Sequence, residues 1–202
     1  MASPQLWVFA GPNGAGKSTL VDRYAAGRLP VINPDNIARD LPRTPSGGLD
    51  ERAAGGRAVA ERISRLAARA TFGFETTLSG NSELRLMRVA AMAGYKVNLV
   101  FVGVRDAETS AARVGERVRA GGHDVPREHS DRRYARAMAN LPVAMSIADR
   151  SIVLDNGGER HRLLLVREDG RTRFESAAMP GWAARAVPAD LRAPPRDQGR
   201  AL

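Results

Sequence analysis

Apolar residues occur along the chain in short runs that predict buried β-strands separated by helices. The run over residues 95–104 is mostly apolar on both faces, as expected of a strand inside a parallel sheet. A final hairpin is predicted from residues 162–167 followed by 168–171. The other runs that predict strands cover residues 6–10, 29–33, 71–77 and 152–155.

Between these runs the apolar residues recur at the spacing of amphipathic helices. Helices are predicted at about 50–70, 82–93, 106–119 and 126–147. Ser82 is expected to cap the second of these helices and Gly94 to end it. Gly121-Gly122 separates the last two helices. The apolar face of the first helix is predicted to consist of Val59, Ile63, Leu66 and Ala70.

Strands that alternate with helices predict an α/β fold in three layers, with a mainly parallel central sheet. At 202 residues the chain is long enough for one such domain and too short for two of ordinary size. We expect this domain to span 1–178, with a lid-like helical segment at about 106–147. The Pro- and Arg-rich residues 179–202 are expected to form a loosely attached tail, from which Trp182 could pack back onto the domain.

The segment after the first predicted strand fits the phosphate-binding P-loop pattern G-x-x-x-x-G-K-[ST], and a helix-like segment follows it. A side chain at Gly11 or Gly16 would prevent backbone N–H groups from approaching phosphate oxygens. We expect Lys17 to contact the β- and γ-phosphates of ATP and Ser18 to bind Mg²⁺. The predicted nucleotide-binding residues are Gly11, Asn13, Gly14, Ala15, Gly16, Lys17, Ser18 and Thr19.

Lysine usage supports this interpretation of the loop. Among 31 Lys and Arg residues, only Lys17 and Lys96 are lysines. A chain that writes almost every positive charge as arginine, yet has lysine in this loop, indicates a need for a compact ammonium group there. The alternative is a glycine-rich turn with an incidental lysine, which the flanking strand and helix argue against.

Carboxylates follow two other predicted strands, where ligands of such folds gather. Asp35 lies just after the second strand and could accept the proton of an acceptor hydroxyl whose oxygen attacks the γ-phosphate. Alternatively, Asp35 caps a helix that begins at Asn36. Glu75, Thr76 and Thr77 end the third strand and could bind sugar hydroxyls or the water shell of Mg²⁺, although threonine-rich strand ends are common.

An arginine-rich segment surrounds the Gly-Gly break. Arg117, Arg119 and Arg132 could close over the triphosphate and stabilise charge that develops during transfer. His123 is a further candidate for substrate or phosphate contact. Part of the segment could instead be an exposed helix face, on which Glu116 pairs with nearby arginines.

Charge and composition narrow the function classes. The net charge of +9 would attract polyanions, but aromatic residues make up only 5% and no nucleic-acid-binding module is recognisable, so a nucleic-acid partner is not favoured. No stretch is long and apolar enough for a membrane span, and no secretory signal is visible, so we expect a cytoplasmic protein without membrane contact. The absence of cysteine excludes disulfides and thiolate metal sites.

Taken together, these segments resemble the zeta-toxin family of P-loop kinases, specifically its shorter stand-alone branch. The resemblance extends from residue 5 to about residue 160. Besides the P-loop, the matching segments are 32–35, 74–79, 117–126, 132–134, 140–141, 148–150 and 155–156.

The resemblance implies a kinase that uses Mg²⁺ and moves the γ-phosphate of ATP onto a hydroxyl of a nucleotide-sugar. In studied relatives this acceptor is UDP-N-acetylglucosamine, the damage to the supply of wall precursors makes the protein toxic, and an antitoxin is a possible partner. By likeness Asp35 would be the base, Lys17 and Ser18 would hold phosphate and metal, and Glu75 with Thr76 would contact the acceptor. The arginines of 113–136 would stabilise the transferring phosphate, although they do not align one to one with those of longer toxins. Related proteins phosphorylate other nucleotides, including NAD.

Two alternatives remain open. One is a nucleic-acid-directed P-loop kinase or NTPase, with which the net charge of +9 is compatible. The other is a partner-binding protein whose activity is held by an antitoxin. Arginines that converge on the P-loop would favour a small substrate, whereas a basic stripe outside it would favour nucleic acid. No separate acidic Walker-B motif is evident, so Mg²⁺ is expected to be held by Ser18, phosphate and water, with Asp35 available to assist.

Overall fold

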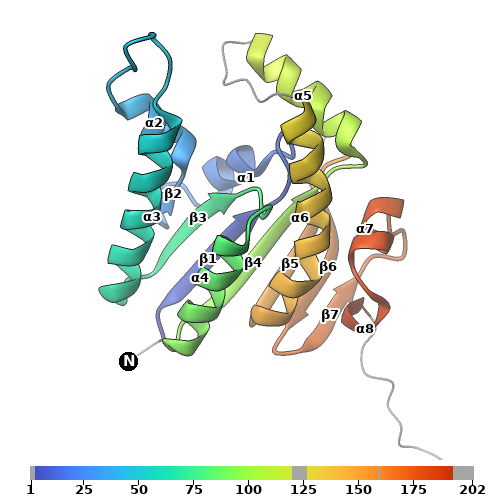
Figure 1. Cartoon of the computed structure of the whole chain (residues 1–202). Helices are drawn as coiled ribbons and strands as arrows, with labels where there is room; N and C mark the ends of the chain where they lie inside the picture. The colour runs from blue at the N-terminus through green and yellow to red at the C-terminus, as the bar shows by residue number, and fades with distance from the viewer. Residues whose placement is uncertain (1–2, 120–126, 159, 193–202) are drawn as a thin grey trace, which may run out of the picture.

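The computed structural model describes residues 3–119, 127–158 and 160–192. Over these residues a seven-stranded sheet lies between two layers of helices (Figure 1). The strand order is β2-β3-β1-β4-β5-β6-β7, and the first five strands of the chain run parallel. The strands are β1 (Gln5–Ala10), β2 (Val31–Ile32), β3 (Phe72–Thr76), β4 (Lys96–Gly103), β5 (Arg150–Asp155), β6 (Arg162–Glu168) and β7 (Arg171–Glu175).

The predicted three-layer α/β fold with a mainly parallel sheet is therefore confirmed. The predicted hairpin is also present, because β6 pairs antiparallel with β5 on one side and with β7 on the other. Its turn is Asp169-Gly170, and both residues have positive φ, the conformation that favours Asp-Gly in two-residue hairpin turns.

Eight helices are described. They are α1 (Lys17–Tyr24), α2 (Pro34–Asp40), α3 (Glu51–Ala67), α4 (Asn81–Met92), α5 (Ala107–Arg119), α6 (Arg127–Ile147), α7 (Gly181–Ala186) and α8 (Ala189–Arg192). The Gly121-Gly122 break that was predicted between α5 and α6 lies outside the described residues.

Two hydrophobic clusters fill the spaces between the layers. On β1, Leu6 and Val8 belong to the larger cluster, whereas Phe9 belongs to the smaller one on the opposite face. This alternation follows from the two-residue period of a strand, whose successive side chains point to opposite faces. The larger cluster contains side chains of α4 and α6, and the smaller one contains Leu20 and Val21 of α1.

The buried face of α3 differs from the predicted one. Val59 and Ile63 are 50% and 58% exposed, while Ala54, Ala58 and Arg62 are buried. The small alanine side chains allow a close approach of the helix, and the arginine reaches a polar cavity instead of solvent. Periodicity alone favours the branched apolar residues and so predicts the wrong face at these two positions.

The start of α4 also differs from the prediction. Gly80 is the residue at the helix N-cap, and it makes no side-chain capping bond. Ser82 lies inside the first turn, where its hydroxyl donates to Glu83 Oε2 at 3.0 Å. The end of the helix follows the prediction, because Gly94 has a φ of 78° just beyond it.

Residues 179–192 pack against the domain, where a loosely attached tail was expected. Trp182 is 3% exposed and its ring lies 6.1 Å from that of Phe101 on β4. Ala183, Ala186 and Val187 are also in the larger hydrophobic cluster. The predicted return of Trp182 to the domain therefore brings two helices with it.

Within the residues that the structure describes, none of the helices has the length and apolar character needed to cross a bilayer.

Candidate functional site

The predicted P-loop connects β1 to α1 at the carboxyl end of the sheet. Gly14 and Gly16 have φ values of 66° and 87°, which side-chain-bearing residues rarely adopt. A Cβ atom at Gly14 would lie 2.7 Å from the carbonyl oxygen of Ser110, and one at Gly16 would lie 2.5 Å from Asn156 Nδ2. The loop therefore needs glycine for its backbone angles and for close neighbours on both sides.

Lys17 begins α1 and points back along the loop. Its Nζ donates to the carbonyl oxygens of Gly11 and Pro12 at 2.8 and 2.9 Å. Lys17 and Ser18 both line a cavity of about 590 Å³. The ammonium group is thus held at the wall of a space large enough for a ligand.

The P-loop is supported from two sides by residues outside it. Ser110 on α5 is fully buried and donates from its hydroxyl to Asn13 O at 2.6 Å. Asn156, just after β5, donates from Nδ2 to Ala15 O at 3.0 Å. His161 lies close to Gly16, and burial lowers its pKa. The position of Asn156 directly after a predicted strand was the sequence signal for such a role, whereas Ser110 gave none.

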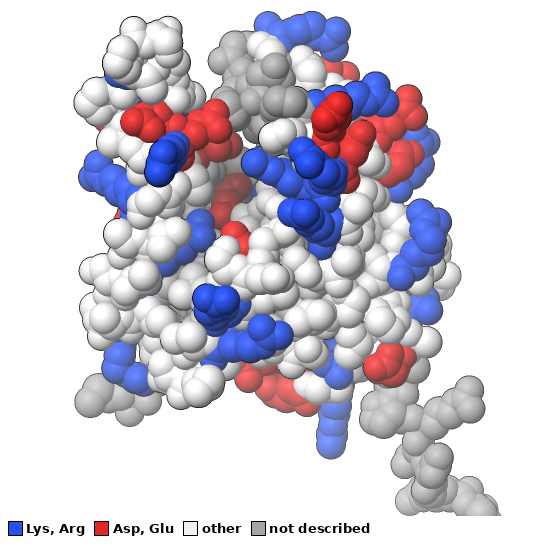
Figure 2. Space-filling view, in the orientation of Figure 1, with Lys and Arg blue, Asp and Glu red and all other residues white. Residues whose placement is uncertain are grey.

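The cavity brings together residues from distant parts of the sequence. The P-loop and the start of α1 form one part of its lining, and α2, α3 and the β3–α4 connection form another. Acidic side chains line the interior of the hollow, and basic side chains gather on its α5–α6 side (Figure 2). Among the predicted site residues, the cavity is lined by Asn13, Gly14, Gly16, Lys17, Ser18, Thr19, Asp35, Glu75 and Thr76.

Glu75 lies at the centre of a buried hydrogen-bond network. It is 7% exposed, and it accepts from Ser18 Oγ at 2.8 Å and from Asn33 Nδ2 at 2.7 Å. Burial raises the pKa of Glu75, although these hydrogen bonds and the charge of Lys17 oppose the rise, and the charge of Asp35 adds to it. One carboxylate oxygen therefore contacts Ser18, the predicted metal ligand, and the other contacts Asn33, the residue that follows β2.

Asp35 lines the cavity from the first turn of α2. The N-cap of this helix is Asn33, whose Oδ1 accepts from the backbone N–H of Asp35 at 2.8 Å. The alternative in which Asp35 caps the helix is therefore wrong. Its carboxylate makes no hydrogen bond or ion pair with any residue that the structure describes, which leaves it available to a ligand.

Thr76 has a structural partner at the end of β3. Its hydroxyl accepts from the backbone N–H of Leu78 at 2.9 Å. Leu78 has a φ of 58°, and its carbonyl oxygen accepts from Asn140 Nδ2 on α6 at 2.9 Å. These contacts fix the turn that carries Thr76 and Thr77 into the cavity.

The arginines of α5 and α6 divide into two groups. Arg113 and Arg133 line the cavity. Arg119 and Arg132 are exposed, and Arg132 Nε donates to Glu128 O of its own helix at 3.3 Å. Neither Arg119 nor Arg132 is among the residues that line the cavity. Arg117 lies in α5, and His123 lies outside the described residues.

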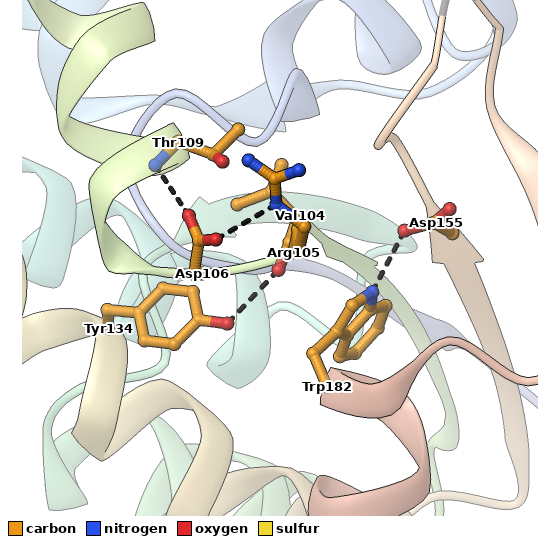
Figure 3. A network of polar contacts seen from close by, with 7 residues as sticks. All are labelled: Val104, Arg105, Asp106, Thr109, Tyr134, Asp155 and Trp182. Atoms are coloured by element: carbon orange, nitrogen blue, oxygen red, sulfur yellow. Dashed lines mark hydrogen bonds and ion pairs between the residues drawn. The ribbon is translucent and has the colours of Figure 1, made fainter.

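A polar network anchors α5, α6 and α7 to the carboxyl end of β4 and β5 (Figure 3). Tyr134 on α6 donates from its hydroxyl to Val104 O at 3.1 Å, and Trp182 Nε1 donates to Asp155 Oδ1 at 2.8 Å. Asp106 accepts from the backbone N–H of Thr109 at 2.7 Å, and its hydrogen bonds lower its pKa to about 2. The hydrogen bond between Asp106 and Thr109 closes the first turn of α5, directly after the end of β4.

The oxygen donors beside the P-loop are suited to Mg²⁺. Ser18 donates to Glu75 and keeps lone pairs on its hydroxyl oxygen, and Glu75 and Asp35 supply carboxylates. Among the described residues there is no group of three or more His, Cys, Asp or Glu side chains placed to hold a metal. The residues therefore fit an ion that takes few protein ligands and keeps phosphate and water around it.

Comparison with known proteins shows the family. Residues 6–139 match the family described as AAA domain. An uncharacterized protein of Haemophilus influenzae is 33% identical over 142 residues, which are 66% of this chain and 100% of the relative. The family match covers β1 to β4 and α1 to α5 and continues into α6, and so contains the P-loop, Asp35 and Glu75.

Solved structures show the same fold. The AvrRxo1-ORF1:AvrRxo1-ORF2 complex with sulphate ions has a TM-score of 0.67 at 16% identity, and the similarity covers 87% of this chain and 62% of that one. A structure of the PezAT chromosomal toxin-antitoxin system of Streptococcus pneumoniae has a TM-score of 0.58 at 14% identity, over 77% of this chain and 69% of that one. This chain thus spans less than two thirds of the AvrRxo1 chain that it matches. These structures therefore share the three-layer α/β fold of this chain.

Proposed function

The chain belongs to the AAA domain family, and from that premise and the geometry of its site we propose that it is an ATP-dependent phosphotransferase of the zeta-toxin type. The proposed reaction transfers the γ-phosphate of ATP to a hydroxyl of a nucleotide-sugar such as UDP-N-acetylglucosamine, and this activity makes the protein toxic to the cell. The observation that carries the proposal is one cavity that contains both a P-loop and a carboxylate, that of Asp35, free of other described partners.

The proposed chemistry assigns the two parts of the cavity to the two substrates. P-loop backbone N–H groups bind the phosphates of ATP, and the ammonium of Lys17 turns from the carbonyls of Gly11 and Pro12 to the β- and γ-phosphates. Arg113 and Arg133 reach the same cavity and neutralise charge that develops on the transferring group.

Asp35 is the proposed general base. Its carboxylate takes the proton of the acceptor hydroxyl while the hydroxyl oxygen forms a bond to the γ-phosphorus. The bond between the γ-phosphorus and the oxygen that bridges it to the β-phosphate breaks, and ADP leaves with that electron pair. Proton, phosphoryl group and electrons are thereby accounted for.

Ser18 and Glu75 would hold Mg²⁺ together with phosphate and water. The ion would supply neutralisation of phosphate charge, as metals do in phosphoryl transfer. In the absence of other ligands, Asn33 and Ser18 hold the Glu75 carboxylate in place through its two oxygens. Burial raises the pKa of Glu75, and the charge of Lys17 opposes that rise by favouring the charged carboxylate. Glu75 is thus positioned to receive a cation beside the loop.

The proposal is tested by incubating the protein with Mg-ATP and a panel of acceptors, with mass spectrometry of the products. The panel contains UDP-sugars, NAD and short oligonucleotides. Transfer to a UDP-sugar is the expected result. Transfer to oligonucleotides alone would contradict the proposal and favour the nucleic-acid-directed alternative, and transfer to NAD alone would correct the acceptor while preserving the reaction type.

An antitoxin partner is a further part of the proposal. The fold similarity to a component of the PezAT toxin-antitoxin system supports it. An antitoxin is needed only if the chain is toxic. Expression of the intact chain and of a Lys17→Ala variant in the same host tests this toxicity. Growth arrest by the intact chain alone is expected, and equal growth with both chains would contradict toxicity.

A further inference from the structure

A buried arginine lines the same cavity from α3. Arg62 is only 9% exposed, and its guanidinium lies over the ring of Phe74, 4.4 Å from the ring centroid. The wall around it is formed by α2, α3 and the segment between β3 and α4. Arginine is almost never buried this deeply unless its charge is paired.

The protein supplies Arg62 with few partners. Its Nη2 donates to Glu75 O at 3.5 Å, a long hydrogen bond, and its buried Nε has no partner among the described residues. No ion pair joins it to a carboxylate of those residues. Burial lowers its pKa, and the charge of Glu83 opposes this only in part. A guanidinium group offers five donors, so most of its binding capacity is unused.

The orientation of α3 makes this burial more significant. Val59 and Ile63 lie beside Arg62 on the helix and are 50% and 58% exposed. Burial of such side chains stabilises a fold because it removes apolar surface from water. The helix therefore presents arginine to the cavity and leaves branched apolar side chains in solvent, an arrangement that stability alone does not favour.

We propose that Arg62 binds an anionic group of the acceptor, a phosphate or carboxylate that fits the planar fork of the guanidinium. The inference rests on the proposed function and deepens it, because it makes the acceptor an anionic compound recognised by α3. The phosphates of ATP have their own ligands in the P-loop and Lys17, so Arg62 remains for the second substrate.

The charges of the cavity explain why one arginine can discriminate between anionic and neutral acceptors. Asp35, Glu75 and Glu83 also line the cavity and repel an anion. Arg62 compensates this repulsion only for an acceptor whose anionic group reaches the guanidinium, where two parallel hydrogen bonds are possible. A neutral sugar or alcohol gains nothing from Arg62 and leaves its donors without partners.

The test measures binding apart from transfer. The P-loop is first saturated with a non-hydrolysable ATP analogue and Mg²⁺, and calorimetry then measures the affinity of acceptor compounds. N-acetylglucosamine 1-phosphate and UDP-N-acetylglucosamine carry phosphate, gluconate carries a carboxylate, and N-acetylglucosamine and glucose are their neutral counterparts. At least one anionic compound is expected to bind at least tenfold more tightly than its neutral counterpart, and the arm that responds identifies the anion.

Three variants assign this preference to the side chain. Arg62→Met keeps an unbranched side chain that can contact Phe74, and it is expected to remove the preference without lowering the melting temperature, because it removes a desolvated charge. Arg62→Lys keeps a charge without the fork and is expected to bind anions more tightly than Arg62→Met. Arg65→Met is the matched control, because Arg65 is on the same helix, pairs with Glu61 at 2.9 Å and does not line the cavity.

Two results would overturn the inference. One is equal affinity of the intact protein and Arg62→Met for every anionic compound. The other is equally weak binding by the Lys and Met variants together with lowered melting temperatures, which would indicate a structural role. Arg62-dependent binding without any phosphoryl transfer would instead contradict the proposed kinase activity and leave the anion site standing, so the two failures are distinguishable.

Discussion

Asp35 is the residue on which the proposed transfer step depends most. We expect Asp35→Asn to lower the rate of transfer by a factor of about 10² or more, since general bases contribute this much, while leaving the affinity for ATP nearly unchanged. The measurement is single-turnover transfer to the acceptor, with nucleotide binding measured separately. Asp22→Asn, at an exposed position of α1, is the control. Near-normal transfer by Asp35→Asn would show that another group takes the proton.

Glu75 is expected to make stability depend on pH. Because burial raises its pKa, the folded protein keeps a proton on this carboxyl at pH values where the unfolded chain has lost it. The unfolded state binds fewer protons in that interval, so stability falls as pH rises from the ordinary glutamate pKa through the raised one. Glu75→Gln removes this loss.

The melting temperatures of the intact protein and of Glu75→Gln are compared without metal or nucleotide. We expect the melting temperature of the variant to rise relative to that of the intact protein as the pH increases above the ordinary pKa of glutamate. Glu175→Gln, at an exposed position of β7, should show no such trend. A difference that stays constant or shrinks as pH rises would contradict the raised pKa.

Among the helices, α6 is joined by the hydroxyl of Tyr134 to Val104, the residue that follows β4. Tyr134→Phe removes the bond to Val104 O and keeps the ring, so we expect a loss of about 1 kcal/mol in the free energy of unfolding, measured with urea. Tyr24→Phe, at a position that is 59% exposed, is the matched control. Equal stability of both variants would mean that α6 is held by packing alone.

The attachment of α7 is expected to contribute more. Trp182→Ala removes a ring that is 3% exposed and the hydrogen bond to Asp155, and substitutions of this kind cost about 3–5 kcal/mol. Phe174→Ala, at a position that is 43% exposed, should cost clearly less in the same urea titration. If the two variants unfold at the same urea concentration, α7 is not part of the cooperative unit.

For the whole molecule, the charge of +9 predicts weak association with nucleic acid that is distinct from the reaction. Arg119 and Arg132 are exposed and outside the cavity lining, so a labelled oligonucleotide should bind at low salt and lose affinity steeply between about 50 and 200 mM salt. Transfer to the small acceptor should persist when the oligonucleotide is added. Oligonucleotide binding that survives high salt and blocks transfer would support the nucleic-acid-directed alternative.

The parts of the fold that the sequence predicts are those written in local patterns. The apolar runs that became β3 and β4 are buried on both faces, and those that became β1 and β5 contain both buried and half-buried positions, so their hydrophobicity marks them directly. The P-loop is a contiguous motif. Asp35 and Glu75 were expected near it because parallel strands end at one edge of the sheet, and the cavity does contain both.

The remaining features depend on helix orientation and on distant contacts. Arg62 lies outside the apolar face that the sequence predicts for α3, because that face contains Val59 and Ile63, which the structure exposes. Arg113 and Arg119 belong to one helix, and only its packing on the P-loop determines which of them lines the cavity. The composition of residues 179–192 gives no sign of the contact between Trp182 and Gly103, beside which a Cβ atom would collide with the indole ring.

The amide of Asn33 connects two events that are otherwise separate. Its oxygen caps the helix that carries Asp35, and its nitrogen holds Glu75. One rigid planar group therefore connects Glu75, beside the proposed metal site, to the helix that carries Asp35, the proposed base. By thermodynamic reciprocity, anything that draws Glu75 away from Asn33 changes the placement of Asp35, and an acceptor that settles Asp35 must in turn favour one arrangement of Glu75. The arrangement of the donor site and that of the acceptor site then both depend on the side chain of Asn33.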